Sequence, residues 1–114
     1  MVTQSMAIYF PESTRWTRLA LVDALRQRLK PLAQHVFLFG SHARGQANAD
    51  SDIDIIIVAE TKRRAPTRAF DFGDALRPLG AVDVIVYTPS EWDQMKASGH
   101  PFLASIQSDL IEVF

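Results

Sequence analysis

The chain has 114 residues, with 12 basic and 13 acidic side chains, no cysteine and a hydrophobic content of 47%. This length predicts a single domain over residues 1–114, with residues 1–13 as an N-terminal arm, and the apolar content is sufficient for a core. The net charge of −1 argues against direct binding of nucleic acid, for which a basic excess is typical. The apolar runs are too short to cross a membrane and the start lacks the pattern of a signal peptide, so we expect a cytoplasmic protein.

The first predicted element is a helix over residues 15–30. Ser13 or Thr14 is a suitable N-cap, and Pro31 stops the helix. Apolar residues form a stripe along this segment, so its arginines are expected mainly to face solvent.

Two apolar strands follow, joined by a turn and a loop. The first strand, residues 35–40, is apolar on both faces and is predicted to be central in a sheet. Gly40 and Ser41 make a sharp turn into a short helical segment that ends near Gly45. The second strand is predicted over residues 52–59.

The second half of the chain continues the alternation of helices and strands. Residues 62–64 and Arg68 are basic and are expected to lie in a solvated loop. The predicted elements are a helix over 69–79 that Gly73 weakens, a strand over 81–88, helices over 89–97 and 100–110, and a terminal strand or tail over 111–114. This order indicates an α/β or α+β fold, with a small mixed sheet and helices packed mainly on one face.

Three aspartates lie in or beside the apolar strands. Asp52 and Asp54 are two residues apart, so in a strand they share a face and lie roughly 7 Å apart. Asp83 sits in the next strand, and the three carboxylates converge if the strands are neighbours. Taken alone, Asp52 at the start of a strand could simply be exposed to solvent. Two carboxylates at about 4 Å repel by roughly 4 kcal/mol at an effective dielectric of 20, so a cluster of three favours a hard divalent cation such as Mg²⁺.

The turn at Gly40 and Ser41 is a candidate phosphate site. Glycine allows a phosphate to approach the backbone closely, and the serine hydroxyl can donate a hydrogen bond to it. Arg44 could reinforce this site or pair with an acidic neighbour. Neither a P-loop nor a dinucleotide-binding glycine pattern occurs in the sequence. An ordinary turn from strand to helix would also explain a lone Gly-Ser pair.

The spacing of these residues resembles a known family. The segment "LFGSHARGQANADSDIDIIIV", with the pattern G-S-x10-D-x-D, is similar to the active-site segment of the minimal nucleotidyltransferases. These are small members of the DNA polymerase β-like superfamily, and the resemblance implies a polymerase β-like palm. It also implies a role for each motif residue. Gly40, Ser41, Arg44 and Ser51 would bind the nucleotide, and Asp52, Asp54 and Asp83 would hold Mg²⁺, with two ions expected.

The resemblance further implies the reaction and the partner. ATP would donate AMP to an acceptor hydroxyl, and Asp83 would help to activate that hydroxyl. Related proteins are antitoxins of HEPN-domain toxins, and some attach AMP to a tyrosine of the toxin. The leading hypothesis is therefore a protein adenylyltransferase that neutralises a HEPN partner. Two alternatives are a transferase for a small-molecule hydroxyl that works with a second subunit, and an antitoxin that acts by binding alone.

Overall fold

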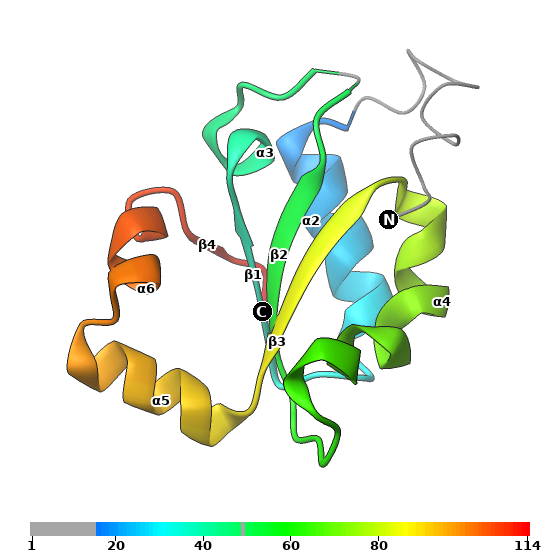
Figure 1. The fold of residues 1–114 in the computed structure, drawn as a ribbon. Helices are drawn as coiled ribbons and strands as arrows, with labels where there is room; N and C mark the ends of the chain where they lie inside the picture. Colours follow the sequence, from blue (N-terminus) through cyan, green and yellow to red (C-terminus); the bar gives the residue numbers. More distant parts are fainter. Residues whose placement is uncertain (1–15, 49) are drawn as a thin grey trace.

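Helices and strands alternate along the chain in the computed structural model, which describes residues 16–48 and 50–114 (Figure 1). The elements are α2 (Arg18–Leu29), β1 (His35–Phe39), α3 (Ser41–Arg44), β2 (Ile53–Val58), the 3₁₀-helix η1 (Ala65–Phe72), α4 (Gly73–Leu76), the 3₁₀-helix η2 (Arg77–Leu79), β3 (Val82–Tyr87), α5 (Pro89–Ser98), α6 (Pro101–Ile106) and β4 (Ile111–Glu112). The predicted N-terminal arm, residues 1–13, lies outside the described residues. Within the described ranges, no helix has the length and apolar character that crossing a membrane requires.

The four strands form one mixed sheet in the order β3-β2-β1-β4. β1 pairs antiparallel with both β2 and β4, whereas β2 pairs parallel with β3. The first strand, β1, lies in the interior of the sheet, as predicted from its apolar sequence, and β2 is the other interior strand. β3 lies at one edge, and the tail of the chain supplies β4 at the other.

Alternate residues of the central strands serve two separate cores. On one face, Ile55 and Ile57 are fully buried against the leucines of α2 and the segment from η1 to η2. On the other face, Ile56 and Val58 pack against Trp92 and the rest of α5 and α6. Figure 1 shows α5 and α6 on the opposite side of the sheet from α2 and α4. The mixed α/β class is confirmed. α2 and the segment from η1 to η2 cover one face of the sheet, and α5 and α6 cover the other face.

The first helix begins later than predicted. The helix starts at Arg18, and the hydroxyl of Thr17 accepts a hydrogen bond from the N–H of Ala20 at 3.1 Å, so Thr17 is its N-cap. The predicted caps, Ser13 and Thr14, lie outside the described residues. Trp16 is not helical, and its indole N–H donates to the carbonyl of Leu79 at 3.0 Å.

The arginines of α2 are exposed to solvent, as predicted, and they also bind other elements of the fold. Three of them donate to backbone carbonyls of other elements: Arg18 to Ala43 at 2.7 Å, Arg26 to Val113 at 3.1 Å and Arg28 to Ala75 at 3.4 Å. Such contacts use the long side chain to satisfy carbonyls that would otherwise lose their hydrogen bonds. The helix is thereby tied to segments from three parts of the chain.

The segment between β2 and β3 is not one helix. The predicted helix over 69–79 is divided into η1, α4 and η2, with a proline near the start of each 3₁₀-helix. Proline cannot donate a backbone hydrogen bond, so it favours the start of a helical turn. α5 begins as predicted, with a capping box between Thr88 and Glu91. α6 is shorter than predicted and ends at Ile106.

Candidate active site at one end of the sheet

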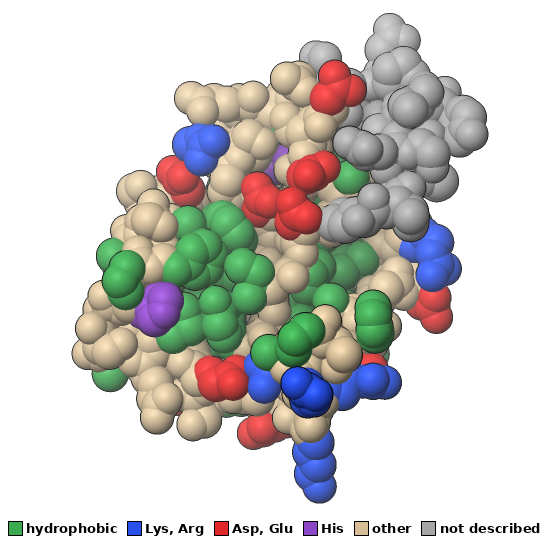
Figure 2. Space-filling view, in the orientation of Figure 1, with side chains coloured by type: hydrophobic (Ala, Val, Ile, Leu, Met, Phe, Trp, Pro, Cys, Tyr) green, Lys and Arg blue, Asp and Glu red, His purple; other side chains and the backbone are tan. Residues whose placement is uncertain are grey.

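Two neighbouring strands, β2 and β3, bring the predicted carboxylates to one end of the sheet. Asp54 of β2 pairs in register with Phe39, the last residue of β1, and with Asp83 near the start of β3. Asp52 directly precedes β2. Acidic side chains gather in the upper part of the face shown in Figure 2. The predicted convergence of Asp52, Asp54 and Asp83 is therefore present in the fold.

The electrostatics of this cluster favour a cation. Burial, together with repulsion from Asp83 and Asp52, raises the pKa of Asp54 from 3.8 to about 6. Burial also raises the pKa of Asp83, with a second contribution from the charge of Asp52. Asp54 and Asp83 are therefore harder to ionise than isolated aspartates, as expected for partly buried groups with like charges nearby. A bound divalent cation would remove this penalty.

The donor set suits a hard metal ion because it consists of carboxylate oxygens. Among the described residues, however, no group of three or more His, Cys, Asp or Glu side chains is arranged as a ready metal site. The binding of Mg²⁺ by Asp52, Asp54 and Asp83 remains a prediction.

Gly40 lies directly against the acidic cluster. Its φ of 77° and ψ of −156° are reached readily by glycine alone, and a Cβ added here would overlap Oδ2 of Asp54. The following residues form α3, which ends at Gly45 in the left-handed conformation with φ of 73°. The predicted turn from strand to short helix is confirmed. The absence of a side chain at Gly40 leaves room for the Asp54 carboxylate.

Arg44 is held near the carboxylates by an acidic neighbour, one of the two roles considered for it. Its Nη1 lies 2.9 Å from Oδ2 of Asp109, in the turn between α6 and β4, and its Nε donates to Gln46 at 3.0 Å. The positive charge of Arg44 lowers the pKa of Asp54, which opposes part of the rise caused by burial. This residue therefore lies close enough to the site to act on its charge balance.

Ser51 and His42 organise the loop that leads into β2. The hydroxyl of Ser51 accepts a hydrogen bond from the N–H of Asn48 at 3.0 Å, so it is used within the loop. The Nε2 of His42, a residue only 5% exposed, lies 3.3 Å from the carbonyl oxygen of Ser51. His42 matches no metal-ligand spacing or other functional pattern in the sequence. The loop contact depends on how α3 and the loop fold together, and no local pattern in the sequence indicates it.

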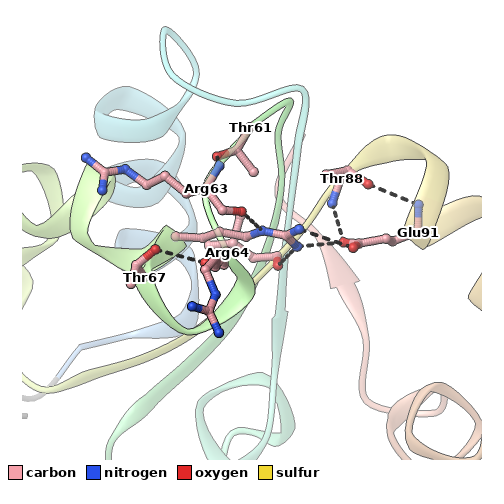
Figure 3. A network of polar contacts seen from close by, with 8 residues as sticks. Thr61, Arg63, Arg64, Thr67, Thr88 and Glu91 are labelled. Carbon is pink, nitrogen blue, oxygen red and sulfur yellow. Dashed lines mark hydrogen bonds and ion pairs between the residues drawn. The ribbon is translucent and has the colours of Figure 1, made fainter.

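A second polar network lies away from this site (Figure 3). Arg68 is only 9% exposed and binds Glu91 through two hydrogen bonds, of 2.6 and 3.2 Å, while also donating to the carbonyl of Val86 at 3.2 Å. Glu91 accepts from the N–H of Thr88 at 2.9 Å, so its pKa is lowered by these partners. The expectation of a solvated basic loop is therefore wrong for Arg68, which fastens η1 to β3 and α5.

The comparisons with known proteins agree with this geometry. A family model described as "Nucleotidyltransferase domain" matches residues 20–110. A solved structure, described as that of a "putative nucleotidyltransferase" from Sulfolobus solfataricus, superposes with a TM-score of 0.52 at 26% sequence identity, covering 73% of this chain and 80% of that one. A Methanocaldococcus jannaschii protein named "putative protein adenylyltransferase" is 44% identical over 39 residues. That match spans 34% of this chain and 39% of the relative.

Proposed function

The chain belongs to the nucleotidyltransferase domain family, and we propose that it is a magnesium-dependent protein adenylyltransferase that transfers AMP from ATP to a hydroxyl group of a partner protein. The observation that carries this proposal is the pairing of Asp54 with Asp83 beside the glycine turn at Gly40. Such an arrangement would combine carboxylate ligands for a cation with a glycine backbone that phosphates can approach. The name of the M. jannaschii relative, a putative protein adenylyltransferase, supports a protein as the acceptor.

In the proposed reaction the acceptor hydroxyl oxygen forms a bond to the α-phosphorus of ATP. The bond between that phosphorus and the oxygen bridging to the β-phosphorus breaks, and pyrophosphate leaves with the electron pair. The hydroxyl proton passes to the Asp83 carboxylate or to water. When bound, Mg²⁺ would neutralise the charge that develops on the attacking and leaving oxygens.

The residues of the chain would mainly position and neutralise the reactants. Asp52 and Asp54 would hold the cation, and Asp83 would face the acceptor hydroxyl. The backbone at Gly40 would let the triphosphate approach, and the hydroxyl of Ser41 would donate to a phosphate oxygen. Arg44 would add positive charge close to the phosphates, held in place by Asp109.

We propose a HEPN-domain toxin as the partner and a tyrosine of that toxin as the acceptor, with the chain acting as its antitoxin. This finer assignment rests on the similarity of the G-S-x10-D-x-D segment to minimal nucleotidyltransferases. Modification of the toxin would neutralise it.

The deciding experiment is the intact mass of a HEPN protein encoded beside this chain, after incubation with the chain, ATP and Mg²⁺. We expect a mass increase that corresponds to one or more AMP groups. Asp52→Ala should abolish the increase, whereas the control Asp74→Ala should preserve it, because Asp74 is an exposed residue of α4 that pairs only with Arg77 among the described residues.

Two results would contradict parts of the proposal. A stable complex without any mass change would mean that neutralisation occurs by binding. Transfer of AMP to glycerol or another small hydroxyl compound, with none to the HEPN protein, would move the acceptor to the small-molecule class.

A further inference from the structure

A cavity of about 920 Å³ lies along the outer edge of β3, between η1 and α5. Its lining is mainly apolar and includes Ala65, Ala69, Val84, Ile85, Met95 and Ala97. We call this cavity the β3 groove. Arg68 and Glu91 also border it, but they neutralise each other through their ion pair. The groove is therefore suited to apolar side chains, and none of the residues assigned to the reaction above lines it.

The backbone of β3 is open on the side of this groove. β3 is an edge strand. The backbone N–H and C=O groups of its odd-numbered residues point toward β2, since the N–H groups of Ile53 and Ala59 donate to the carbonyls of Ala81 and Tyr87. Successive residues of a strand direct their N–H and C=O groups to opposite sides. Val84 therefore directs its N–H and C=O away from β2, and within the described ranges no hydrogen bond joins them to a residue on that side.

One group on this edge already has a partner. The carbonyl of Val86 accepts from Arg68 at 3.2 Å, so the far end of the edge is closed. The available backbone lies around Val84, next to Asp83. The N–H and C=O groups of Val84 have no partner on this side among residues 16–48 and 50–114, and they lie beside an apolar cavity. This combination matches the chemistry of an extended polypeptide segment, which supplies both backbone hydrogen bonds and alternating side chains.

The groove begins next to the acidic site, because Val84 and Ile85, which line it, follow Asp83 in β3. Asp83 and Ile85 are two residues apart in β3 and point to the same face, as do their register partners Asp54 and Ile56. Figure 2 shows apolar side chains gathered beside and below the acidic cluster. A segment that pairs with β3 at Val84 would reach the carboxylates within about two residues, roughly 7 Å.

We propose that the β3 groove holds the acceptor of the transfer reaction, an extended apolar peptide segment that adds to the edge of β3 and carries its hydroxyl to Asp83. This inference rests on the proposed function and specifies how the protein substrate is recognised. The segment is recognised through backbone pairing and apolar contacts. A free small hydroxyl compound cannot make most of these contacts.

The test uses the full chain, ATP, Mg²⁺ and a pool of heptapeptides with a central tyrosine and alternating apolar residues. A second pool has the same sequences with N-methylated backbone amides beside the tyrosine. N-methylation removes the donors needed for strand pairing, and each lost hydrogen bond contributes about 0.5–1.5 kcal/mol, so we expect transfer to fall about threefold to tenfold per bond.

Two variants address the groove from the side of the protein. Val84→Pro removes the outward N–H of β3, and proline is tolerated on edge strands where the N–H faces away from the sheet. Ala97→Arg fills the groove from an exposed position on α5. Ala104→Arg makes the same change on the exposed surface of α6, outside the groove lining, and serves as the matched control. We expect Val84→Pro and Ala97→Arg each to lower kcat/KM for the peptide at least tenfold, with ATP affinity unchanged, and Ala104→Arg to have no effect.

The other outcomes are distinguishable. The inference would be overturned if both peptide pools accepted AMP equally and if Ala97→Arg transferred AMP as well as the wild type. Binding of ATP and Mg²⁺ without transfer to any peptide would overturn it as well, but would leave the nucleotide site standing. Failure of the wild-type chain to bind ATP and Mg²⁺ would instead contradict the proposed function. A dimer in solution that Val84→Pro separates would assign the groove to a second copy of the chain.

Discussion

Asp54 of β2 lies directly beside Asp83 of β3 in the parallel register of the two strands. Like charges in this arrangement destabilise the folded chain when both carboxyls are ionised. The same arrangement provides the oxygen ligands that a divalent cation requires. The repulsion that destabilises the folded chain and the proposed binding of a cation therefore have the same origin, the close placement of Asp54 and Asp83.

The first prediction concerns pH. The folded-state pKa of Asp54, about 6, is higher than its ordinary value of 3.8, so the folded state binds this proton more tightly than the unfolded state. The contribution of Asp54 to stability is therefore present at low pH and is lost as the pH rises from about 4 to about 6. After discounting for solvent screening, we expect this loss to be about 1–2 kcal/mol.

Asp54→Asn tests this prediction because the amide does not titrate. Urea unfolding without divalent ions should show that the variant is more stable than the wild type at pH 7, with the advantage disappearing near pH 4. Asp74→Asn, an exposed change, should follow the wild-type curve. Parallel curves for Asp54→Asn and the wild type would show that Asp54 ionises without cost in the folded chain.

The second prediction compares two glycines with positive φ. Gly40→Ala should destabilise the chain by about 2 kcal/mol or more, because the backbone is strained for alanine and its Cβ would overlap the Asp54 carboxylate. Gly45→Ala should cost only about 1 kcal/mol, since no atom lies within 4 Å of the added Cβ. Urea unfolding measures both values.

The same pair of variants separates strain from function. Gly40→Ala should also lower ATP affinity at least tenfold, because the carboxylate must move, whereas Gly45→Ala should change it little. Equal ATP affinity in the two variants would mean that the contact between Gly40 and Asp54 has no role in nucleotide binding.

The third prediction concerns the network of Figure 3. Arg68→Leu removes both hydrogen bonds to Glu91 and the donor to the Val86 carbonyl, and we expect a loss of about 2–3 kcal/mol in the free energy of unfolding. Arg63→Leu, which breaks an exposed ion pair with Asp71, should cost about 0.5 kcal/mol or less. Equal losses in the two variants would show that burial adds nothing to the Arg68 network.

The Arg68 network also has a pH signature. Its partners lower the pKa of Glu91, so this stabilisation is present above the ordinary pKa of glutamate, 4.5, and is lost as the pH falls through the lowered folded-state pKa. The difference in stability between the wild type and Arg68→Leu should therefore shrink in acid. A difference independent of pH would assign the effect to packing alone.

The fourth prediction concerns His42. His42→Ala removes the contact with the Ser51 carbonyl and should raise the KM for ATP several-fold, because the loop before Asp52 loses its link to α3. His42→Gln replaces the ring N–H with a side-chain amide N–H, which can also donate to the Ser51 carbonyl, and should restore most of the affinity. Steady-state kinetics with both variants, together with urea unfolding, separates this positioning role from a loss of stability. Matching KM values for both variants and the wild type would contradict that role.

The local conformation of the site followed from the sequence. The turn at Gly40, the end of α3 at Gly45 and the common face of Asp52 and Asp54 depend on backbone geometry within a few residues, which glycine and strand periodicity determine. The two buried strands were also predictable, because a continuous apolar run indicates a strand covered on both faces. The start of α2 at Arg18 was not, since a suitable cap also occurs a few residues earlier.

The tertiary structure alone decided which distant groups meet. The partners Arg44 and Asp109 are 65 residues apart, Arg68 and Glu91 are 23 apart, and no spacing rule links either pair. The edge position of β3, and with it the groove beside Val84, depends on the order in which the strands assemble. The sequence by itself therefore determined the chemistry of the site, because local backbone preferences set the positions of glycines and carboxylates. The packing of the sheet determined its surroundings, because contacts between distant segments depend on the whole fold.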